Sequence, residues 1–310
     1  MMETYDVAII GAGPGGLTAG LYCGRARLGT LILEEKVPGG ELLNTARIED
    51  YPGFEEVSGQ ELAERMEGQA RKFRVEIRQE SVLEVTSEGK WKKVTTEERT
   101  YQAGAVIVAA GGKPRKLDVP GEAELAGRGV SYCALCDGPF FQDQVIAVVG
   151  GGNTAVEEAD YLTKFGKKVF IIHRRGEFRA QPIIQERALN NAKIEVLWNT
   201  VVTEIKGDRE VRAVQVKNVE GLEDWELAVQ GVFIFIGFTP NNIKKDHAKH
   251  DQAGFFLTNE KMETSVPGIY AVGDIRAQPV RQITNAVADG TVAAVMAQKY
   301  LEEHQLVSRK

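Results

Sequence analysis

Short apolar runs, glycine-rich turns and helical patterns follow one another in the same order in two parts of this sequence. In the first part, the apolar run Tyr5–Ile10 precedes a helical pattern over Gly15–Arg27 and a second apolar run, Thr30–Leu33. The second part repeats this order in three segments, Val145–Val149, Thr154–Phe165 and Val169–Ile172. Short, continuously apolar runs are typical of buried parallel strands. Each part therefore predicts a β-α-β unit, and the repetition indicates an internal duplication of a nucleotide-binding domain.

The C-terminal region predicts one more strand and a long helix. The run Gly268–Asp274 is apolar and ends in glycine and an acid, and a helical pattern extends over Thr284–Glu303. We expect this region to complete the first domain, into which the second domain is inserted. The two expected junctions, Lys113–Gly121 and Gly237–Asn242, each contain proline and glycine.

The predicted fold class is therefore α/β, with two Rossmann-like dinucleotide-binding domains, one inserted into the other. We expect the outer domain to comprise residues 1–114 and 243–310 and the inserted domain to comprise residues 115–242. The chain has 310 residues, which exceeds the usual size of one compact core.

The composition narrows the classes of partner. The chain is 43% hydrophobic and 26% charged, with a net charge of −6 and no basic stripe, which argues against nucleic acid and anionic lipid as partners. No apolar run is long enough to cross a bilayer, and residues 1–10 show no signal peptide. We expect a soluble, cytoplasmic protein without a membrane or nucleic-acid partner.

The turn after the first predicted strand has the spacing of a dinucleotide-binding fingerprint, G-x-G-x-x-G, in the sequence GAGPGG that starts at Gly11. Gly11 permits a tight turn, Gly13 lets a pyrophosphate approach the backbone, and Gly16 lets the helix pack closely on the strand. The N-terminus of the following helix offers free N–H groups to the diphosphate. An acid after the second strand, either Glu34 or Glu35, is placed to bind the hydroxyls of an unphosphorylated ribose.

A second fingerprint, GGGNTA, starts at Gly150, and it differs from the first at the end of the next strand. There the chain carries no acid but has His173, Arg174, Arg175 and, further on, Arg179. Guanidinium groups at this position suit the 2′-phosphate of a ribose, with which they form paired, charge-assisted hydrogen bonds. The alternative is a solvated basic patch, and it stays open for Arg179. The second domain is therefore predicted to bind NADPH.

Two of the three cysteines form a C-x-x-C pair, Cys133 and Cys136, directly before the second fingerprint. Such pairs occur in zinc sites, in redox centres and by chance. A zinc site needs about four ligands, which the histidines of this sequence are not spaced to supply, whereas the position between two nucleotide-binding units favours a redox pair. Asp137 is placed either to donate a proton to a departing thiolate or to form a turn with the next glycine. The remaining Cys23 is predicted to be a buried, inert thiol.

Together these motifs closely resemble those of the bacterial low-molecular-weight thioredoxin reductases, class II of the pyridine nucleotide–disulfide oxidoreductases, over essentially the whole chain. The matching segments are Gly11–Gly16, Gly39-Gly40, Tyr51–Phe54, Pro120–Glu122, Cys133–Gly138, Gly150–Ala155, His173–Ala180, Gly273-Asp274 and Arg281-Gln282. The resemblance implies an enzyme that carries FAD in the split domain and NADPH in the inserted one, forms a homodimer and reduces the disulfide of thioredoxin.

The resemblance also assigns residues to each cofactor and to the reaction. For FAD it implies Gly11, Gly13, Pro14, Gly16, Glu34, Glu35, Gly39, Gly40, Glu41, Asn44, Ala110, Gly111, Gly273, Asp274, Arg281, Gln282 and Ile283. For NADPH it implies Gly150, Gly152, Asn153, Thr154, His173, Arg174, Arg175 and Arg179. Among the catalytic residues, Cys136 is expected to lie against the flavin, Cys133 to attack the substrate disulfide, and Asp137 to donate a proton.

Several positions depart from the commonest pattern of these enzymes. Glu41 stands where glutamine is usual, Ala110 replaces a frequent threonine, and the pair Gln181-Pro182 replaces serine and lysine. Leu135 takes the place of a threonine between the two cysteines and makes the redox turn more apolar.

Three alternative functions are open on the sequence. A flavoprotein reductase for a peroxiredoxin or another thioredoxin-like partner shares the chemistry, but the alkyl hydroperoxide reductases usually carry an N-terminal thioredoxin-like domain, which we do not expect ahead of Gly11. A ferredoxin- or flavodoxin-linked relative would lack the redox pair or the arginine run. A non-catalytic redox sensor would bind dinucleotides without turning them over. The favoured prediction is electron transfer from NADPH through FAD and the Cys133–Cys136 disulfide to thioredoxin.

Overall fold

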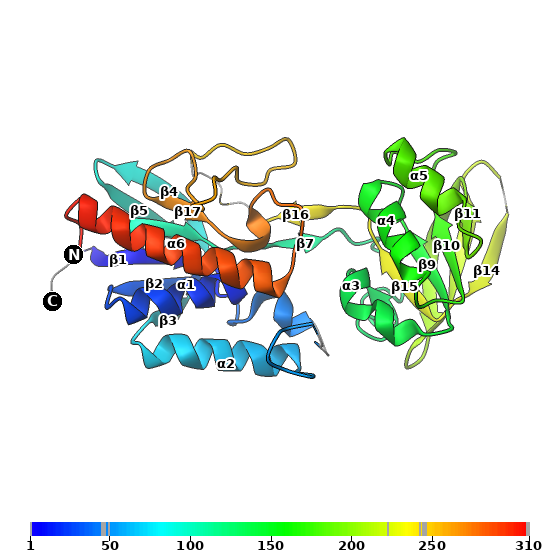
Figure 1. The fold of residues 1–310 in the computed structure, drawn as a ribbon, viewed down its shortest axis with the longest axis horizontal. Helices are drawn as coiled ribbons and strands as arrows, with labels where there is room; N and C mark the ends of the chain where they lie inside the picture. Colours follow the sequence, from blue (N-terminus) through cyan, green and yellow to red (C-terminus); the bar gives the residue numbers. More distant parts are fainter. Residues whose placement is uncertain are drawn as a thin grey trace. The chain divides into compact units, whose positions relative to one another are not determined.

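The computed structural model describes residues 2–44, 48, 50–221, 223–241, 243 and 247–307. The chain forms two compact units, whose elements are labelled in Figure 1. Unit 1 comprises Met1–Lys113 and Thr239–Lys310, and unit 2 comprises Pro114–Phe238.

The two segments that connect the units are short strands that pair with each other. They are β7 (Gly112–Pro114) and β16 (Phe238–Pro240). The junction expected at Gly237–Asn242 includes β16, but its last residue, Asn242, lies outside the described residues.

Unit 1 is built on a seven-stranded sheet with the order β3-β2-β1-β6-β5-β4, in which β17 also pairs with β6. Its strands are β1 (Glu3–Ile10), β2 (Thr30–Glu34), β3 (Glu76–Gln79), β4 (Val82–Glu88), β5 (Trp91–Thr96), β6 (Thr100–Val108) and β17 (Ile269–Ala271). The strands β3, β2, β1, β6 and β17 run parallel, and β5 and β4 extend the sheet in antiparallel fashion. The carboxyl ends of the parallel strands therefore meet at one edge, as in other Rossmann-like sheets.

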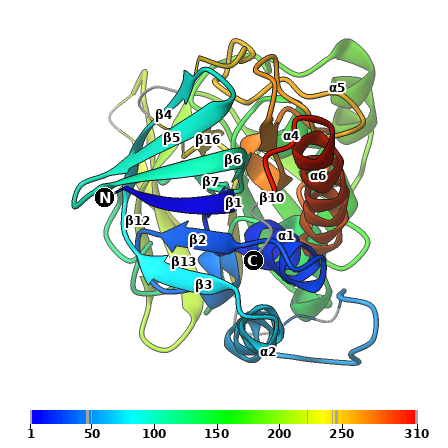
Figure 2. The same ribbon diagram turned by 90° about the vertical axis from the view of Figure 1, so that its left-hand side faces the viewer.

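Helices cover one face of this sheet, as Figure 2 shows: α1 (Pro14–Arg25), α2 (Gly59–Lys72) and α6 (Ile283–Glu303). Their apolar side chains and those of the central strands form one core cluster. The helices α1 and α6 approach closely because Gly290 has no side chain: a Cβ there would lie 2.3 Å from the carbonyl oxygen of Gly15. This contact places the first turn of α1 beside Gly290, which lies two turns into α6.

The opposite face of the sheet has a second core cluster. Buried side chains from β4 and β5, among them Val85 and Val94, pack there with Phe256 and Ile275 from the segment before and after β17. The unit also contains two short 3-10 helices, η1 (Gly40–Asn44) and η3 (Gly273–Ile275), of which η3 follows β17 directly.

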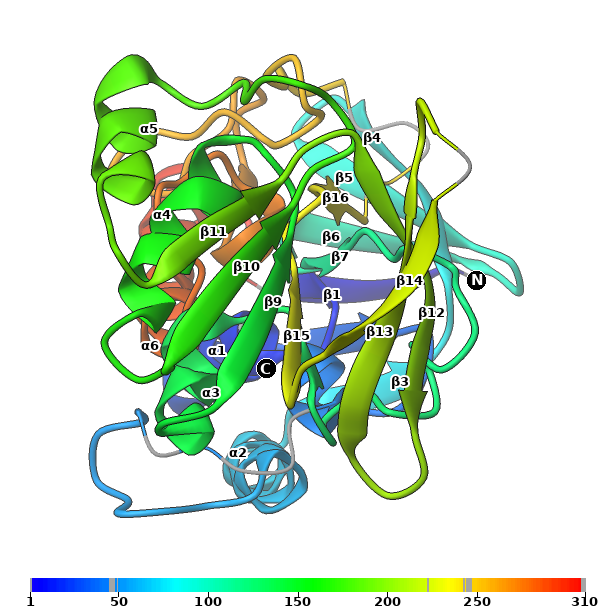
Figure 3. The same cartoon turned by 90° about the vertical axis from the view of Figure 1, so that its right-hand side faces the viewer.

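Unit 2 repeats the parallel arrangement on a smaller scale, with the strand order β11-β10-β9-β15-β8. The strands are β8 (Val130–Ser131), β9 (Val145–Val149), β10 (Lys168–Ile172), β11 (Ile194–Leu197) and β15 (Gly231–Ile234). The helical segments are α3 (Ala134–Asp137), η2 (Gly138–Phe141), α4 (Asn153–Leu162) and α5 (Pro182–Leu189). The helices pack on one face of the sheet in a core cluster of their own (Figure 3).

The other face of the unit 2 sheet packs against an antiparallel three-stranded sheet, also visible in Figure 3. Its strands are β12 (Thr200–Gly207), β13 (Val211–Asn218) and β14 (Asp224–Ala228), in that order. Both faces of the parallel strands are therefore buried, which accounts for their continuously apolar sequences.

Both predicted β-α-β helices occur, but they end earlier than expected. Helix α1 ends at Arg25, because Arg27 has a φ of 60°, a left-handed conformation that ends a helix. Helix α4 ends at Leu162, whose carbonyl oxygen accepts hydrogen bonds from the N–H groups of both Phe165 and Gly166. The expected ends at Arg27 and Phe165 are wrong for this reason.

The predicted strands also change at their ends. Strand β1 begins at Glu3, and β2 extends to Glu34. The strand expected over Gly268–Asp274 is shorter, because Gly268 and Gly273 have positive φ values of 75° and 68° and so bracket β17. Among the helices in the described ranges, none combines the length and apolar character needed to cross a membrane.

Candidate dinucleotide and redox sites

In the fingerprint turn of unit 1, two of the three glycines have no room for a side chain, and the third has room on its Cβ side. Gly11 has a φ of 99°, and a Cβ there would lie 2.4 Å from the carbonyl oxygen of Ala109 on the neighbouring β6 side. A Cβ on Gly16 would lie 1.9 Å from the Gly11 carbonyl oxygen. At Gly13, by contrast, no atom lies within 4 Å of the Cβ position. The turn therefore leaves room at the one glycine where a pyrophosphate has to approach the backbone.

Three further predicted segments lie around this turn. The N–H of Gly39 donates to the carbonyl of Ala12 at 2.8 Å, and a Cβ on Gly40 would lie 3.2 Å from the Cα of Gly13. Ala110-Gly111 follows the end of β6, and the Cβ position of Gly111 is also open. Glu41 is exposed on η1. Asn44 is the last residue of η1, and its side chain lies outside the described part of the structure.

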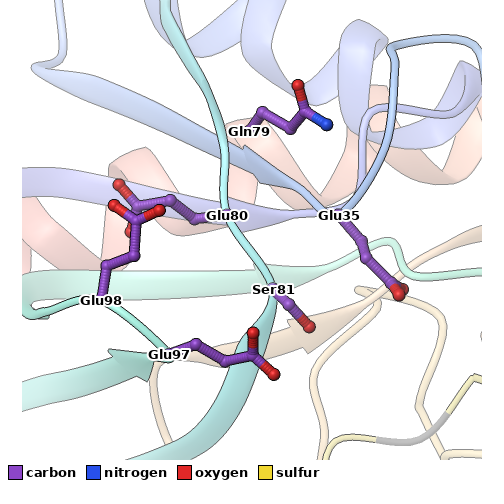
Figure 4. A pocket seen from close by; sticks show the side chains of 6 residues that line it. All are labelled: Glu35, Gln79, Glu80, Ser81, Glu97 and Glu98. Atoms are coloured by element: carbon purple, nitrogen blue, oxygen red, sulfur yellow. The ribbon is translucent and has the colours of Figure 1, made fainter.

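The two candidate acids after β2 have different surroundings. Glu34 turns back to the fingerprint: its Oε2 accepts a hydrogen bond from the N–H of Ala12 at 2.7 Å, and its Oε1 accepts one from the backbone N–H of Lys36 at 3.1 Å. Glu35 instead lines a cavity of about 250 Å³ together with residues from the β3–β4 and β5–β6 turns, Gln79, Glu80, Ser81, Glu97 and Glu98 (Figure 4). The geometry thus separates two residues that the sequence left equivalent.

The start of α6 closes the opposite side of the same region. Its residue Ala286 lies close to both Gly15 and Gly273. A Cβ on Gly15 would lie 3.2 Å from the Ala286 carbonyl oxygen, and a Cβ on Gly273 would lie 3.3 Å from the Ala286 Cβ. The N-cap of α6, Gln282, makes no side-chain cap hydrogen bond. The first N–H groups of the helix, beginning with Ile283, are therefore available to a negatively charged ligand.

Acidic and basic groups alternate beside this helix start. Burial raises the pKa of Asp274 to about 6; the positive charge of Arg281 opposes this, while Glu41 and Asp289 add to it. The guanidinium of Arg281 lies 4.5 Å from the ring centroid of Phe255, and burial lowers its pKa. Asp274 therefore becomes protonated in a pH range in which ordinary aspartates stay charged.

The fingerprint turn of unit 2 has the same open and closed positions. Gly150 has a φ of 150°, and a Cβ there would lie 2.4 Å from the carbonyl oxygen of Phe235. The Cβ position of Gly152 is open. Asn153 and Thr154 begin α4, whose N-cap, Gly152, makes no side-chain cap bond. A pyrophosphate can therefore approach this helix N-terminus too.

The predicted NADPH residues after β10 lie beside this turn. His173 is buried, and its ring packs against Gly151, where a Cβ would lie 2.3 Å from the imidazole. The backbone N–H of Arg179 donates to the Gly151 carbonyl at 2.8 Å. Arg174, Arg175 and Arg179 are exposed, and within the described part of the chain none of them forms an ion pair. Their guanidinium groups are therefore available to a phosphate.

His173 has a supporting place in this arrangement. Its ring lies 5.7 Å from that of Phe178 and 6.2 Å from that of Trp198. Burial lowers the pKa of His173, and the positive charges of the nearby arginines lower it further, while a hydrogen bond with the backbone of Glu177 opposes both. The lowered pKa favours the neutral imidazole, which supports the turn from inside while the arginines provide the charge.

Cys133 and Cys136 form a disulfide at the start of α3, with Cα atoms 5.4 Å apart. The Cys133 sulfur accepts a hydrogen bond from the N–H of Cys136 at 3.1 Å, and the N–H of Asp137 donates to the Cys133 carbonyl at 3.1 Å. Both cysteines and Asp137 are half-buried, and Leu135 is 45% exposed. The third cysteine, Cys23, is a free buried thiol whose pKa burial raises to about 12, as expected for an inert residue.

The sequence profile of the family described as pyridine nucleotide-disulphide oxidoreductase matches residues 5–290. The chain belongs to this family. It is 47% identical to the thioredoxin reductase of Listeria innocua over 304 residues, which cover 97% of this chain and 95% of that protein. It is also 47% identical to the thioredoxin reductase of Bacillus subtilis over 305 residues, which cover 98% of this chain and 96% of that protein.

The solved structures of this oxidoreductase family include one with closely similar coordinates. The crystal structure of thioredoxin reductase from Streptococcus pyogenes matches this chain with a TM-score of 0.94 and 46% sequence identity. The match covers 98% of this chain and 100% of that chain. The α/β fold class with two Rossmann-like domains, predicted from the sequence, is confirmed.

Three residues, one at each dinucleotide site and one at the redox pair, were not anticipated from the sequence. Asp289 accepts a hydrogen bond from the backbone N–H of Gly273 at 3.0 Å. Ser131 Oγ accepts one from the N–H of Cys133 at 3.1 Å. Gly151 has to be glycine because of the His173 ring. Only for Asp289 did the sequence hold a signal, an acid within the largely apolar helical pattern that ends the chain.

Proposed function

We propose that this oxidoreductase is a thioredoxin reductase, which transfers electrons from NADPH through FAD and the Cys133–Cys136 disulfide to the disulfide of thioredoxin. The observation that carries the proposal is a disulfide at a helix start in the same unit as an arginine-bearing fingerprint. A second fingerprint, with an acid at its strand end, lies in the other unit. The names of the similar proteins support the same function.

Unit 1 would hold FAD at the carboxyl edge of its sheet. The open glycine positions at Gly13 and Gly111 leave space for the ligand. The N-termini of α1 and α6 offer N–H groups to the diphosphate and to the flavin end, respectively. When bound, FAD supplies the two-electron chemistry that links a nicotinamide to a disulfide.

The acids of unit 1 suit the adenosine end of that cofactor. Glu34 lies against the fingerprint turn, where it would bind the ribose hydroxyls. The cavity next to Glu35 lies at the carboxyl ends of β2 and β3, where the adenine of a dinucleotide lies in a Rossmann-like domain. Glu35 therefore belongs to the adenine side of the site in this proposal.

Unit 2 would hold NADPH at Gly150, Gly152 and the start of α4. Arg174 and Arg175 are exposed at the end of β10, where the 2′-phosphate of a bound NADPH would lie. An acid in the same place would repel this phosphate. Arg179 contributes backbone contacts to the turn, and its side chain adds positive charge.

The reduced cysteine pair would act on the substrate by thiol–disulfide exchange. Cys133 is the N-cap of α3, and the N–H of Cys136 points to its sulfur, an arrangement that stabilises a thiolate. The Cys133 thiolate attacks one sulfur of the thioredoxin disulfide and forms a mixed disulfide, and Asp137 protonates the departing thioredoxin thiolate. The Cys136 thiolate then attacks the Cys133 sulfur and expels the second thioredoxin sulfur as a thiolate, which takes a proton from solvent, and the Cys133–Cys136 disulfide is restored.

We propose the same cellular setting and assembly as for the enzymes that this chain resembles. The protein is expected to act in the cytoplasm as a homodimer. The buried free thiol of Cys23 is consistent with a reducing compartment.

The experiment that tests the function is steady-state oxidation of NADPH by the FAD-loaded protein in the presence of oxidised thioredoxin from Bacillus subtilis. We expect turnover that depends on thioredoxin and is much slower with NADH. A protein that binds FAD but oxidises NADPH no faster when thioredoxin is added would be a sensor or a reductase for another acceptor, and the proposal would be wrong.

A further inference from the structure

The turn at Gly273-Asp274 is held from behind by an acid that is not among the residues expected to contact FAD. Asp289, on α6, is 8% exposed, and its Oδ2 accepts a hydrogen bond from the N–H of Gly273 at 3.0 Å. Gly273 is buried and has a left-handed φ of 68°. A hydrogen bond to a carboxylate is stronger than one between neutral groups. It therefore favours the one backbone conformation that determines where Asp274 lies.

A continuous chain of polar contacts extends from Asp289 to the Asp274 carboxylate. Arg276 Nη1 lies 3.6 Å from Asp289 Oδ2, and its Nε donates to Thr258 Oγ1 at 3.0 Å. Arg276 Nη1 also donates to Gln278 Oε1 at 3.1 Å, and Gln278 Nε2 donates to Asp274 Oδ1 at 3.4 Å. The side chains of Arg276 and Asp289 are only 16% and 11% exposed, so solvent screens their charges weakly.

We propose that Asp289, paired with Arg276, is a positioning residue that holds Gly273-Asp274 in the conformation that binds FAD. This inference rests on the proposed function, which places FAD at this turn. Well-packed apolar residues often stabilise a protein as well as a buried ion pair does, whereas fixed charges can favour one backbone conformation, which points to a positioning role for this pair. Loss of Asp289 is therefore expected to weaken FAD binding more than its effect on folding explains.

Asp6 provides a matched control in the same unit. It is 2% exposed, and its Oδ2 accepts a hydrogen bond from the N–H of Gly29 at 2.6 Å. Gly29 precedes the amino end of β2, whereas the expected FAD residues follow the carboxyl ends of the strands. The same substitution at Asp6 and at Asp289 therefore removes the same kind of buried carboxylate, but only the second is expected to affect FAD.

The test is titration of FAD into four FAD-free proteins: wild type, Asp289→Ala, Asp289→Asn and Asp6→Asn. Binding is measured by the quenching of flavin fluorescence. The free energy of unfolding of each protein is measured in parallel by urea denaturation. Asp289→Ala is expected to raise the Kd for FAD at least about tenfold. Asp289→Asn keeps an acceptor for the N–H of Gly273 but loses the charge that pairs with Arg276. Its Kd for FAD should therefore lie between the Kd of wild type and that of Asp289→Ala. Asp6→Asn should stay within about twofold of wild type.

Arg276→Gln is the second variant, and it keeps the inference testable where Asp289→Ala does not fold. It removes the same ion pair from the other side and should raise the Kd for FAD at least about threefold. The inference is overturned if Asp289→Asn and Arg276→Gln both bind FAD within about twofold of wild type. It is also overturned if Asp6→Asn loses as much FAD affinity at an equal loss of stability. A wild-type protein that binds no FAD would instead overturn the proposed function.

Discussion

The two fingerprint turns of this molecule share the geometry of their glycines but differ in the residues that follow the next strand, β2 in unit 1 and β10 in unit 2. In both, the first glycine has a positive φ, and its Cβ position meets the carbonyl oxygen of the residue that follows the adjacent strand, Ala109 for Gly11 and Phe235 for Gly150. In both, the glycine that starts the helix, Gly13 or Gly152, has an open Cβ position. In the proposed function, this shared part binds the chemical group that the two dinucleotides share, a pyrophosphate.

The difference lies where the next strand ends. In unit 1, Glu34 accepts a hydrogen bond from the fingerprint turn through its carboxylate. In unit 2, the neutral ring of His173 packs under the turn, and Arg174 and Arg175 extend into solvent. We propose that this difference in charge after the second strand distinguishes the two dinucleotides, with a negative group for ribose hydroxyls and positive groups for a ribose phosphate.

The third position of the fingerprint offers the most disruptive test of this comparison. A Cβ on Gly16 would lie 1.9 Å from the Gly11 carbonyl oxygen, whereas unit 2 already has Ala155 there. Gly16→Ala should therefore distort the turn and weaken FAD binding on the order of 100-fold, as measured by titration of the FAD-free protein. Ala155→Gly should cost about 2 kcal/mol of unfolding free energy, from the lower helix propensity of glycine and the loss of a buried methyl group, and should leave FAD binding unchanged. A Gly16→Ala protein whose Kd for FAD stays within about twofold of wild type would contradict the comparison.

Removal of the basic groups of unit 2 should have the next largest effect. The double substitution Arg174→Gln and Arg175→Gln is expected to raise the KM for NADPH at least about tenfold, because hydrogen bonds to a charged phosphate contribute about 1.5–3 kcal/mol each. The KM for NADH should stay within about twofold, since NADH lacks the 2′-phosphate. The exposed Arg212→Gln on β13 is the control. An equal loss with NADH, or a native preference for NADH, would exclude this role.

In unit 1, replacing either of the two candidate acids by glutamine should change the Kd for FAD by a smaller amount, and by different amounts for the two acids. Glu34→Gln is expected to raise the Kd for FAD about fivefold, because the charged acceptor beside Ala12 is lost. Glu35→Gln should change it less than about twofold, since its side chain points to the neighbouring cavity. Titration of both FAD-free variants under the same conditions decides between them, and the reverse order would reassign the ribose contact to Glu35.

The smallest expected effect concerns the pH dependence of stability. Burial raises the pKa of Asp274 to about 6 from an ordinary value of 3.8. The folded protein therefore binds a proton that the unfolded chain releases, so this group destabilises the FAD-free protein above pH 6, and the destabilisation is relieved as the pH falls to 4. Between pH 7.5 and pH 5 the wild type should gain about 1 kcal/mol relative to Asp274→Asn.

Urea denaturation of the two FAD-free proteins at both pH values measures this difference, and the comparison cancels the other titrating groups. If the free energies of unfolding of the two proteins change in parallel between pH 7.5 and pH 5, the pKa of Asp274 is not raised in the folded protein.

Much of the fold could be predicted from the sequence because its signals are local. The continuous apolar runs identify strands buried on both faces, and the glycine spacings at Gly11 and Gly150 mark the turns that follow them. The ends of α1 and α4 could not be predicted, because they depend on the left-handed backbone of Arg27 and on two N–H groups that share the Leu162 carbonyl.

The parts of the sites that could not be predicted depend on contacts between distant residues. The choice between Glu34 and Glu35 follows from which side chain reaches the N–H of Ala12. Asp289 acts on Gly273 only because α6 folds back over the end of β17. The requirement for glycine at position 151 comes from His173, which lies on another strand end.

In the proposed function the two nucleotide units act in series on the Cys133–Cys136 disulfide, and a comparison of Cys136→Ser with the wild type tests this order of electron transfer. Both FAD-loaded proteins are mixed with NADPH, with and without oxidised thioredoxin, while flavin absorbance and NADPH oxidation are recorded. We expect that NADPH still bleaches the flavin of Cys136→Ser but that thioredoxin-dependent NADPH oxidation is lost. Thioredoxin reduction at the wild-type rate by Cys136→Ser would contradict it.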